Sequence, residues 1–292
     1  MEVCCIIEER ASLGESPVWS AAENAVYWVD IRGQKIHRTD PESGNTNAWD
    51  MPSCPGMIAL RKSGGLVVAL QDGLYGFDPD SGKIDLLVAL EADLPDNRAN
   101  DGKCDAAGRL WVGTMNHATD GAEPTGSFYR IDPDLTVSKI QSDIRIPNGL
   151  TWNPDSTLMM TTDSRSGVAN IHDFDLAAGT RSNNRQFFTF NRAVTGSVDG
   201  AAMDTEGGYW AALYKGGKLV RVMADGTIDQ EIPLPVSQPT MPAFGGADMK
   251  TIFITSASQR LSDESLAAQP LAGGLFTVTI DVPGCPVGMF GG

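Results

Sequence analysis

The chain has little positive charge and almost no histidine. Its 292 residues include 22 Lys and Arg against 37 Asp and Glu, which leaves a formal net charge of −15 at pH 7. This balance repels phosphate backbones and anionic membrane surfaces, so we expect no nucleic-acid partner. Only His37, His117 and His172 are present, and Gly-x-Ser-x-Gly, Walker-type and Gly-x-Gly-x-x-Gly motifs are missing. A His-based nucleophilic triad and nucleotide chemistry are therefore disfavoured.

Long apolar runs and paired cysteines are also lacking. The first ten residues hold an apolar run of only five residues followed by acids, unlike a signal peptide or a membrane span. The five Cys are odd in number and scattered, which favours reduced thiols over disulfides or a zinc site. We therefore expect a cytoplasmic protein that does not bind membranes, as a monomer or a small homo-oligomer.

A repeated pattern of short apolar strands and Gly, Asn, Asp or Pro turns fills most of the chain. Its copies open at Glu15, Pro55, Asp101, Asn148 and Asp199, and a weaker sixth copy begins near Pro242. The steps between them are 40 (55 − 15), 46 (101 − 55), 47 (148 − 101) and 51 (199 − 148) residues. Steps of this size suit one four-stranded propeller blade each.

These features predict an all-β fold, a six-bladed β-propeller with four-stranded blades that forms a single domain over residues 1–292. The strand from Val3 to Ile7 precedes the first repeat and is expected to close the ring as the outer strand of the sixth blade. The Gly- and Pro-rich end, Pro283 to Gly292, is expected to be ragged. The polar insert from Asn116 to Pro124 is expected to hang over one face as a lid or rim.

The opening residues of the repeats carry the candidate chemistry. Equivalent positions of the blades lie at one height around the central axis, so their side-chain oxygens are expected to converge on a divalent cation. Glu15, Asn148 and Asp199 are the predicted metal ligands. Turn formation by Asn148-Gly149 and Asp199-Gly200 is the alternative, but Glu15 has little preference for turns and favours the metal.

Polar residues crowd the third opening position, around Asp101. Arg98 offers a bidentate fork and Asn100 both a donor and an acceptor, so we interpret these two as substrate-binding residues; a solvated loop is the alternative. About fifteen residues beyond the opening positions stand Asp30, Asn116, Asp163 and Tyr214. Asp30 and Asp163 are interpreted as structural, and Asn116 and Tyr214 as further substrate contacts.

Several of these segments together carry a family resemblance. They are Gly14-Glu15-Ser16-Pro17-Val18-Trp19, Asn97-Arg98-x-Asn100-Asp101-Gly102-Lys103, Asn148-Gly149-Leu150-x-Trp152, Asp199-Gly200 and Phe244-Gly245-Gly246. The chain resembles the sugar lactonases that include gluconolactonases, xylonolactonases and regucalcin, the senescence marker protein. The resemblance implies one divalent cation held by Glu15, Asn148 and Asp199, a lactone held by Arg98 and Asn100, and Asp199 doubling as proton acceptor.

The chain also departs from that family pattern. Val198 stands where a Pro is usual and Ala243 where a Cys is usual, and Asn116-His117 replaces a stretch in which some members carry a substrate-contacting Glu. The sugar preference therefore cannot be carried over.

The resulting hypothesis is metal-dependent hydrolysis of an aldonolactone to the sugar acid, with Asp199, helped by Asp101, accepting a proton. Ca²⁺ is the first candidate cation, and Mg²⁺, Mn²⁺, Zn²⁺ and Fe²⁺ are alternatives. Two other functions compete: a non-enzymatic metal-binding propeller, and an ester or organophosphate hydrolase with a more apolar rim.

Overall fold

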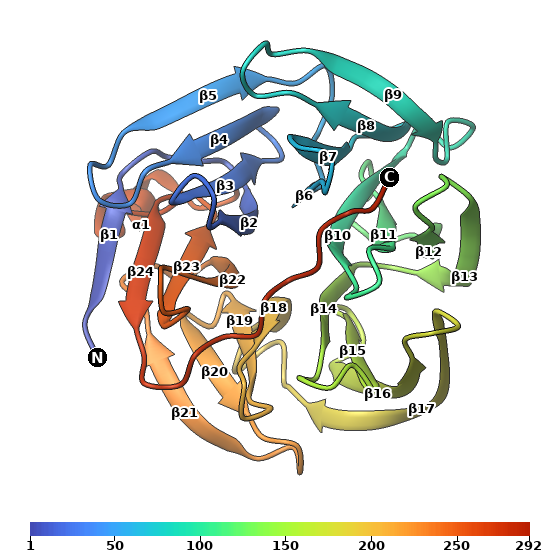
Figure 1. Cartoon of the computed structure of the whole chain (residues 1–292). Coiled ribbons are helices and arrows are strands. Elements are labelled where there is room, and N and C mark those ends of the chain that lie inside the picture. The colour runs from blue at the N-terminus through green and yellow to red at the C-terminus, as the bar shows by residue number, and fades with distance from the viewer.

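The computed structural model describes all 292 residues and contains six four-stranded antiparallel sheets, arranged as blades around a central axis (Figure 1). The first three blades comprise, from the inner strand outward, β2 (Gly14–Ser20), β3 (Ala25–Asp30), β4 (Lys35–Thr39) and β5 (Thr46–Asp50); β6 (Met57–Leu60), β7 (Leu66–Ala69), β8 (Gly73–Phe77) and β9 (Ile84–Ala89); β10 (Asn97–Cys104), β11 (Leu110–Asn116), β12 (Gly126–Ile131) and β13 (Val137–Ile144). The last three comprise β14 (Pro147–Trp152), β15 (Leu158–Asp163), β16 (Val168–Asp175) and β17 (Thr180–Thr189); β18 (Ser197–Met203), β19 (Tyr209–Tyr214), β20 (Lys218–Val222) and β21 (Ile228–Pro233); β22 (Pro239–Gly245), β23 (Thr251–Ser256), β24 (Leu275–Thr279) and β1 (Val3–Ile7). The predicted six-bladed propeller is confirmed.

The ring closes through the N-terminal strand, as predicted. β1 pairs antiparallel with β24, and Val3 lies opposite Val278. The outer strand of the sixth blade therefore comes from the opposite end of the chain to its other three strands. The only helix, α1 (Asp263–Ala268), lies between β23 and β24, and no helix of the structure could span a membrane.

The expected ragged end is instead ordered. Residues 283–292 run across the centre of the ring (Figure 1), and Phe290 is fully buried. Backbone bridges join the tail to Arg61, Cys104 and Asp204, at or just beyond the ends of β6, β10 and β18. The prediction was wrong because the Gly and Pro residues allow close backbone approach here: a Cβ on Gly288 would lie 2.1 Å from the Asp105 carbonyl oxygen.

Buried tryptophans hold the blades together, as the sequence indicated. Trp111 and Trp210 are at most 1% exposed. Their ring N–H groups donate to Asp105 and Asp204, each at 2.9 Å, and each carboxylate also accepts a hydrogen bond from an arginine. These polar contacts satisfy the buried groups while the indole rings fill the space between sheets.

Five of the six inner strands carry a β-bulge near their first residues. At each bulge, two paired residues of the inner strand are three positions apart, while their partners on the second strand are only two positions apart. The inner-strand residues that flank the bulges are Glu15/Val18, Ala99/Gly102, Asn148/Thr151, Val198/Ala201 and Pro239/Pro242. The inner strand of the second blade, β6, pairs without interruption. Since a bulge bends the strand and re-aims its side chains, it sets where polar residues enter the channel.

Candidate active site

The bulges place the predicted residues at different positions of the repeat. Glu15 and Asn148 are the last paired residues before their bulges, Asp199 is the first unpaired residue, and Asp101 is the second. The expectation of one shared position was therefore wrong for Asp101 and Asp199, because spacing along the sequence does not reveal where the extra residue lies. The bulges nevertheless bring these side chains into one neighbourhood.

Asn148 is the centre of a polar network. Its Nδ2 donates to Asp199 Oδ1 at 2.7 Å and to Ser164 Oγ at 2.8 Å. Its Oδ1 accepts from Asn100 Nδ2 at 2.9 Å. The network links the inner strands of the third, fourth and fifth blades, and it joins two predicted metal ligands directly.

The two predicted carboxylate ligands lie in an unfavourable environment for negative charge. Burial raises the pKa of Glu15 well above its usual value, and the charges of Asp199 and Asp101 raise it further. Burial and the charge of Asp101 likewise raise the pKa of Asp199. The only hydrogen bond to Glu15 comes from the backbone N–H of Ser16, at 3.2 Å. A cation between these carboxylates would remove the repulsion.

The donor set fits a hard divalent cation. No three His, Cys, Asp or Glu side chains cluster as a metal site, so the candidate centre has two carboxylates, Glu15 and Asp199, and the carboxamide of Asn148. Such oxygen ligands suit Ca²⁺ or Mg²⁺. Because Asn148 directs its nitrogen toward Asp199, its oxygen can take part only by a rotation of the amide or through its second lone pair.

Arg98 and Asn100 lie beside this centre. Arg98 is only 3% exposed; its Nη1 donates to the Ala99 carbonyl at 2.7 Å and to Asn100 Oδ1 at 2.8 Å. Its Nε is buried without a partner, and burial lowers the pKa of Arg98 to about 10. Asn100 also donates to the Pro147 carbonyl at 2.9 Å, which fixes the orientation of its amide.

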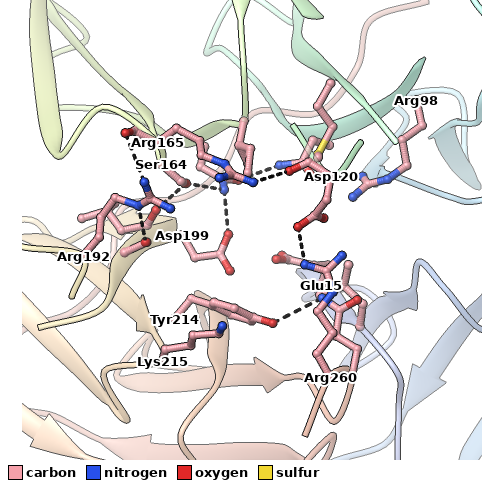
Figure 2. A pocket seen from close by; sticks show the side chains of 18 residues that line it. Glu15, Arg98, Asp120, Ser164, Arg165, Arg192, Asp199, Tyr214, Lys215 and Arg260 are labelled. Atoms are coloured by element: carbon pink, nitrogen blue, oxygen red, sulfur yellow. Dashed lines mark hydrogen bonds and ion pairs between the residues drawn. The ribbon is translucent and has the colours of Figure 1, made fainter. Parts of the chain in front are cut away.

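A polar cavity of about 390 Å³ opens above these residues (Figure 2). Its lining consists of Leu13, Glu15, Arg98, Asn100, Met115, Asp120, Ile146, Asn148, Ser164, Arg165, Arg192, Ser197, Val198, Asp199, Tyr214, Lys215, Gln259 and Arg260. The lining lies at the start of the inner strands, whereas the C-terminal tail crosses their other ends. A volume of this size suits a small organic ligand.

Asp101 lies behind the cavity rather than on its surface. It accepts a hydrogen bond from the Leu150 backbone N–H at 3.1 Å, and burial raises its pKa while the charge of Lys103 opposes the shift. Lys103 is itself buried, and it donates to the carbonyl oxygens of Leu150, at 3.0 Å, and Ala201. Sequence reasoning missed Lys103, although a Lys within a buried strand is the available signal.

The other predicted residues divide between the cavity and the turns. Tyr214 lines the cavity, and burial raises its pKa to about 12. Asp30 and Asp163 have the structural role expected, since each accepts hydrogen bonds from backbone N–H groups of nearby loops.

Asn116 is not brought to the cavity. It pairs with Asn97, and its neighbour Met115, opposite Arg98, lines the cavity in its place. Successive strand residues face opposite ways, so an offset of one residue turns the side chain away. Asn116 Oδ1 instead accepts from the Thr119 N–H at 2.8 Å and supports the insert. That insert overhangs the cavity as predicted, because Asp120 lies in its lining.

Sequence reasoning also missed the cations at the cavity mouth, Arg165, Arg192, Lys215 and Arg260. They follow different strands, and no motif connects them.

Comparison with known proteins agrees with the fold. Residues 13–258 match the family model described as the SMP-30/Gluconolactonase/LRE-like region. The chain is 37% identical to the 6-deoxy-6-sulfogluconolactonase of Pseudomonas putida over 290 residues, which cover 99% of this chain and 98% of the relative. It is 36% identical to chicken (Gallus gallus) regucalcin over 297 residues, covering 100% of this chain and 99% of that protein.

A solved structure shows the same architecture. The calcium-binding protein regucalcin of Agrobacterium tumefaciens superposes with a TM-score of 0.93 at 30% identity, covering 98% of this chain and 96% of the other. The resemblance inferred from the motifs is thereby confirmed, and the chain belongs to the SMP-30/gluconolactonase/LRE-like family.

Proposed function

We propose that this protein hydrolyses a sugar lactone to the corresponding sugar acid, with the help of a divalent cation held by Glu15, Asn148 and Asp199. The observation that carries the proposal is the meeting of two mutually repelling carboxylates with a buried guanidinium in one polar cavity. The lactonases among the relatives support the same reaction.

A cation held by Glu15, Asn148 and Asp199 would supply Lewis-acid chemistry, which favours negative charge on the lactone carbonyl oxygen. Ca²⁺ is the first candidate, because a relative of known structure is described as calcium-binding. Mg²⁺, Mn²⁺, Zn²⁺ and Fe²⁺ remain alternatives.

Arg98, Asn100 and Tyr214 are assigned to the substrate. The Arg98 guanidinium and the Tyr214 hydroxyl belong to residues that line the cavity and can bond to the lactone's oxygens, and Asn100 fixes the direction of the Arg98 fork. Because Arg98 is held by packing and by two hydrogen bonds, it loses little freedom when substrate binds.

Asp199 is the proposed proton acceptor, since it lines the cavity while Asp101 does not. Asp101 acts behind it, where its charge raises the pKa of Asp199. The Asp199 carboxylate would accept the proton that the attacking water releases.

The rival functions fit the site less well. A structural cation has no need of an arginine beside it in the lining of an open cavity. An ester or organophosphate hydrolase calls for an apolar rim, whereas only 5 of the 18 lining residues are hydrophobic.

A lactone panel assayed by acid release tests the proposal. It should include five- and six-membered aldonolactones and 6-deoxy-6-sulfogluconolactone, the substrate named for the Pseudomonas relative. Each lactone is assayed on chelated protein and again after each cation is restored, with spontaneous opening subtracted. Absence of turnover across the whole panel, with every cation, would reject the proposal.

A further inference from the structure

The mouth of the cavity gathers positive charge in an acidic protein. Five of the 22 Lys and Arg residues line it, against three of the 37 Asp and Glu. Two of those three acids, Glu15 and Asp199, lie at the candidate metal centre. The remaining mouth has four cations, Arg165, Arg192, Lys215 and Arg260, against the single carboxylate of Asp120. The whole protein has a net charge of −15, so the excess of positive charge at the mouth is a specific feature of this surface.

The carboxylate of Asp120 is already paired with Arg260. The two side chains form a short ion pair, and Arg32 lies 3.9 Å from the same carboxylate. Burial raises the pKa of Asp120, but the hydrogen bond from Arg260 and the charges of Arg260, Arg165 and Arg32 outweigh it and lower the pKa. No carboxylate at the mouth is left for the other three cations.

Arg165, Arg192 and Lys215 have only neutral partners or none. Arg165 donates to the backbone carbonyl of Asp120 at 2.8 Å, and its Nε is buried without a partner. Arg192 contacts only Ser197 Oγ, at 3.3 Å, and the Arg165 carbonyl, at 3.5 Å. Lys215 forms no ion pair and has a φ of +65°, a conformation that few residues other than Gly and Asn adopt.

These three cations lie on one side of the cavity. Figure 2 shows Arg165, Arg192 and Lys215 on the side of Asp199, and Arg98 on the opposite side. A ligand that places its reactive carbonyl between Glu15 and Asp199 therefore has room to direct another group toward the three cations. Planar guanidinium groups and an ammonium group suit the oxygens of a tetrahedral or planar anion.

We propose that the lactone carries an anionic group, a sulfonate, phosphate or carboxylate, at the terminal carbon of the sugar, which is carbon 6 in a gluconolactone. Arg165, Arg192 and Lys215 bind this group. The inference rests on the proposed lactonase function for the identity of the rest of the ligand. The charged residues at the mouth define the anion site independently of the candidate metal centre.

Matched pairs of lactones test the inference. Glucono-1,5-lactone is compared with its 6-phosphate, its 6-deoxy-6-sulfonate and an analogue with a carboxylate at carbon 6, and the three charged arms identify the anion. The expected kcat/KM is at least tenfold higher for one charged lactone than for the neutral one, and this preference should shrink as salt rises. Equal or better turnover of the neutral lactone would overturn the inference and leave the lactonase proposal standing.

A double variant, Arg192→Gln with Lys215→Gln, tests the residues themselves. Both side chains are exposed, so the fold is retained. The ratio of kcat/KM for the charged to the neutral lactone should fall about tenfold or more. Lys218→Gln is the matched control, because Lys218 pairs with Glu231 at 2.8 Å outside the cavity. An unchanged ratio in the double variant would remove these residues from the anion site.

Binding without turnover separates the two proposals. In calorimetry, 1,5-anhydroglucitol 6-phosphate should bind at least tenfold more tightly than 1,5-anhydroglucitol, and the double variant should lose this difference. If that result is obtained and no lactone is hydrolysed, the anion site stands and the lactonase proposal fails. If the two compounds bind equally, the anion site is rejected.

Discussion

Asn148 presents its amide nitrogen, not its oxygen, to Asp199 at 2.7 Å. The orientation is imposed from the other side, because Asn100 donates to the Asn148 oxygen and is itself fixed by Arg98 and the Pro147 carbonyl. A rotation of the Asn148 amide that turns its oxygen toward a cation would break this hydrogen bond between two proposed ligands. Substitutions of Asn148 and Asp199 distinguish a residue that only binds the cation from one that also accepts a proton.

Asp199→Asn should lower cation affinity, because it removes a negative charge, and should depress activity even at saturating metal, because it removes the proton acceptor. Truncating a hydrogen bond to a charged group costs about 1.5–3 kcal/mol, so a tenfold or larger loss is expected. Calorimetric cation binding and lactone turnover measure the two effects. Asn148→Ala is the control, since an Asn cannot be the base. Added metal should restore the activity of Asn148→Ala to a greater extent than that of Asp199→Asn. Full recovery of Asp199→Asn would make Asp199 a ligand only.

Arg98→Ala should reduce kcat/KM for the lactone about tenfold or more and leave cation affinity nearly intact. The reason is that Arg98 contacts Ala99 and Asn100 and none of the proposed ligands. Arg98→Lys should recover little activity, because an ammonium group cannot form the same fork. A matching loss of metal from Arg98→Ala would contradict the assignment of this residue to the substrate.

Lys103→Met should destabilise the fold by about 3 kcal/mol, because it leaves the buried Asp101 without its cation. Two carbonyl oxygens, of Leu150 and Ala201, also lose their donor. Urea unfolding measures the change. Asp101→Asn in the same chain should recover part of the loss, while Lys83→Met, which breaks an exposed pair with Asp85, should hardly move the midpoint. A midpoint for Lys103→Met close to that of Lys83→Met would rule out the buried Lys103 ammonium as a source of stability.

His37 should make stability depend on pH. Its ring stacks on Trp28 at 4.0 Å, and neither ring nitrogen has a hydrogen-bond partner. Although Glu9 Oε2 lies 3.4 Å from Nδ1, burial dominates and lowers the pKa of His37 from 6.5 to about 4. The unfolded chain thus binds the proton more readily. The contribution of His37 is complete above pH 6.5 and is lost as pH falls toward 4.

The lost stabilisation amounts to about 3 kcal/mol, since one pKa unit corresponds to about 1.4 kcal/mol. His37→Phe keeps a ring stacked on Trp28 and should make the free energy of unfolding depend less on pH between 6.5 and 4. Urea midpoints at half-unit pH steps measure the difference between the two proteins. Parallel curves for both would show that the pKa of His37 is the same in the folded and the unfolded protein.

The sequence alone predicted the architecture because turn residues and strand alternation are local signals that recur in every blade. It did not predict register. Asp199 and Asp101 were assigned the position of Glu15, yet the bulges shift them by one and two residues. Asn116 was misplaced in the same way, since Met115 is the residue that faces the cavity. Spacing measured along a chain cannot locate an extra residue within a strand.

The cations at the mouth were beyond sequence reasoning for a different reason. Arg165, Arg192, Lys215 and Arg260 come from separate connections, and only the closed ring brings them together. Lys103 could have been identified from the sequence, because it stands two residues after Asp101 in a buried strand. A Lys in that setting requires buried acceptors, which the carbonyl oxygens of Leu150 and Ala201 supply.

The pairing of Val3 with Val278 has a kinetic consequence. Five blades consist of strands that are neighbours along the chain, and each can form through short hairpins. The sixth needs partners 275 residues apart (278 − 3). Contacts at such separation form late, because the entropy of closing the intervening loop is lost before they provide any stabilisation. An open arc of five complete blades and a three-stranded sixth, with an unpaired edge at β24, is therefore the expected folding intermediate, and the docking of β1 is the step that ends its exposure to other chains.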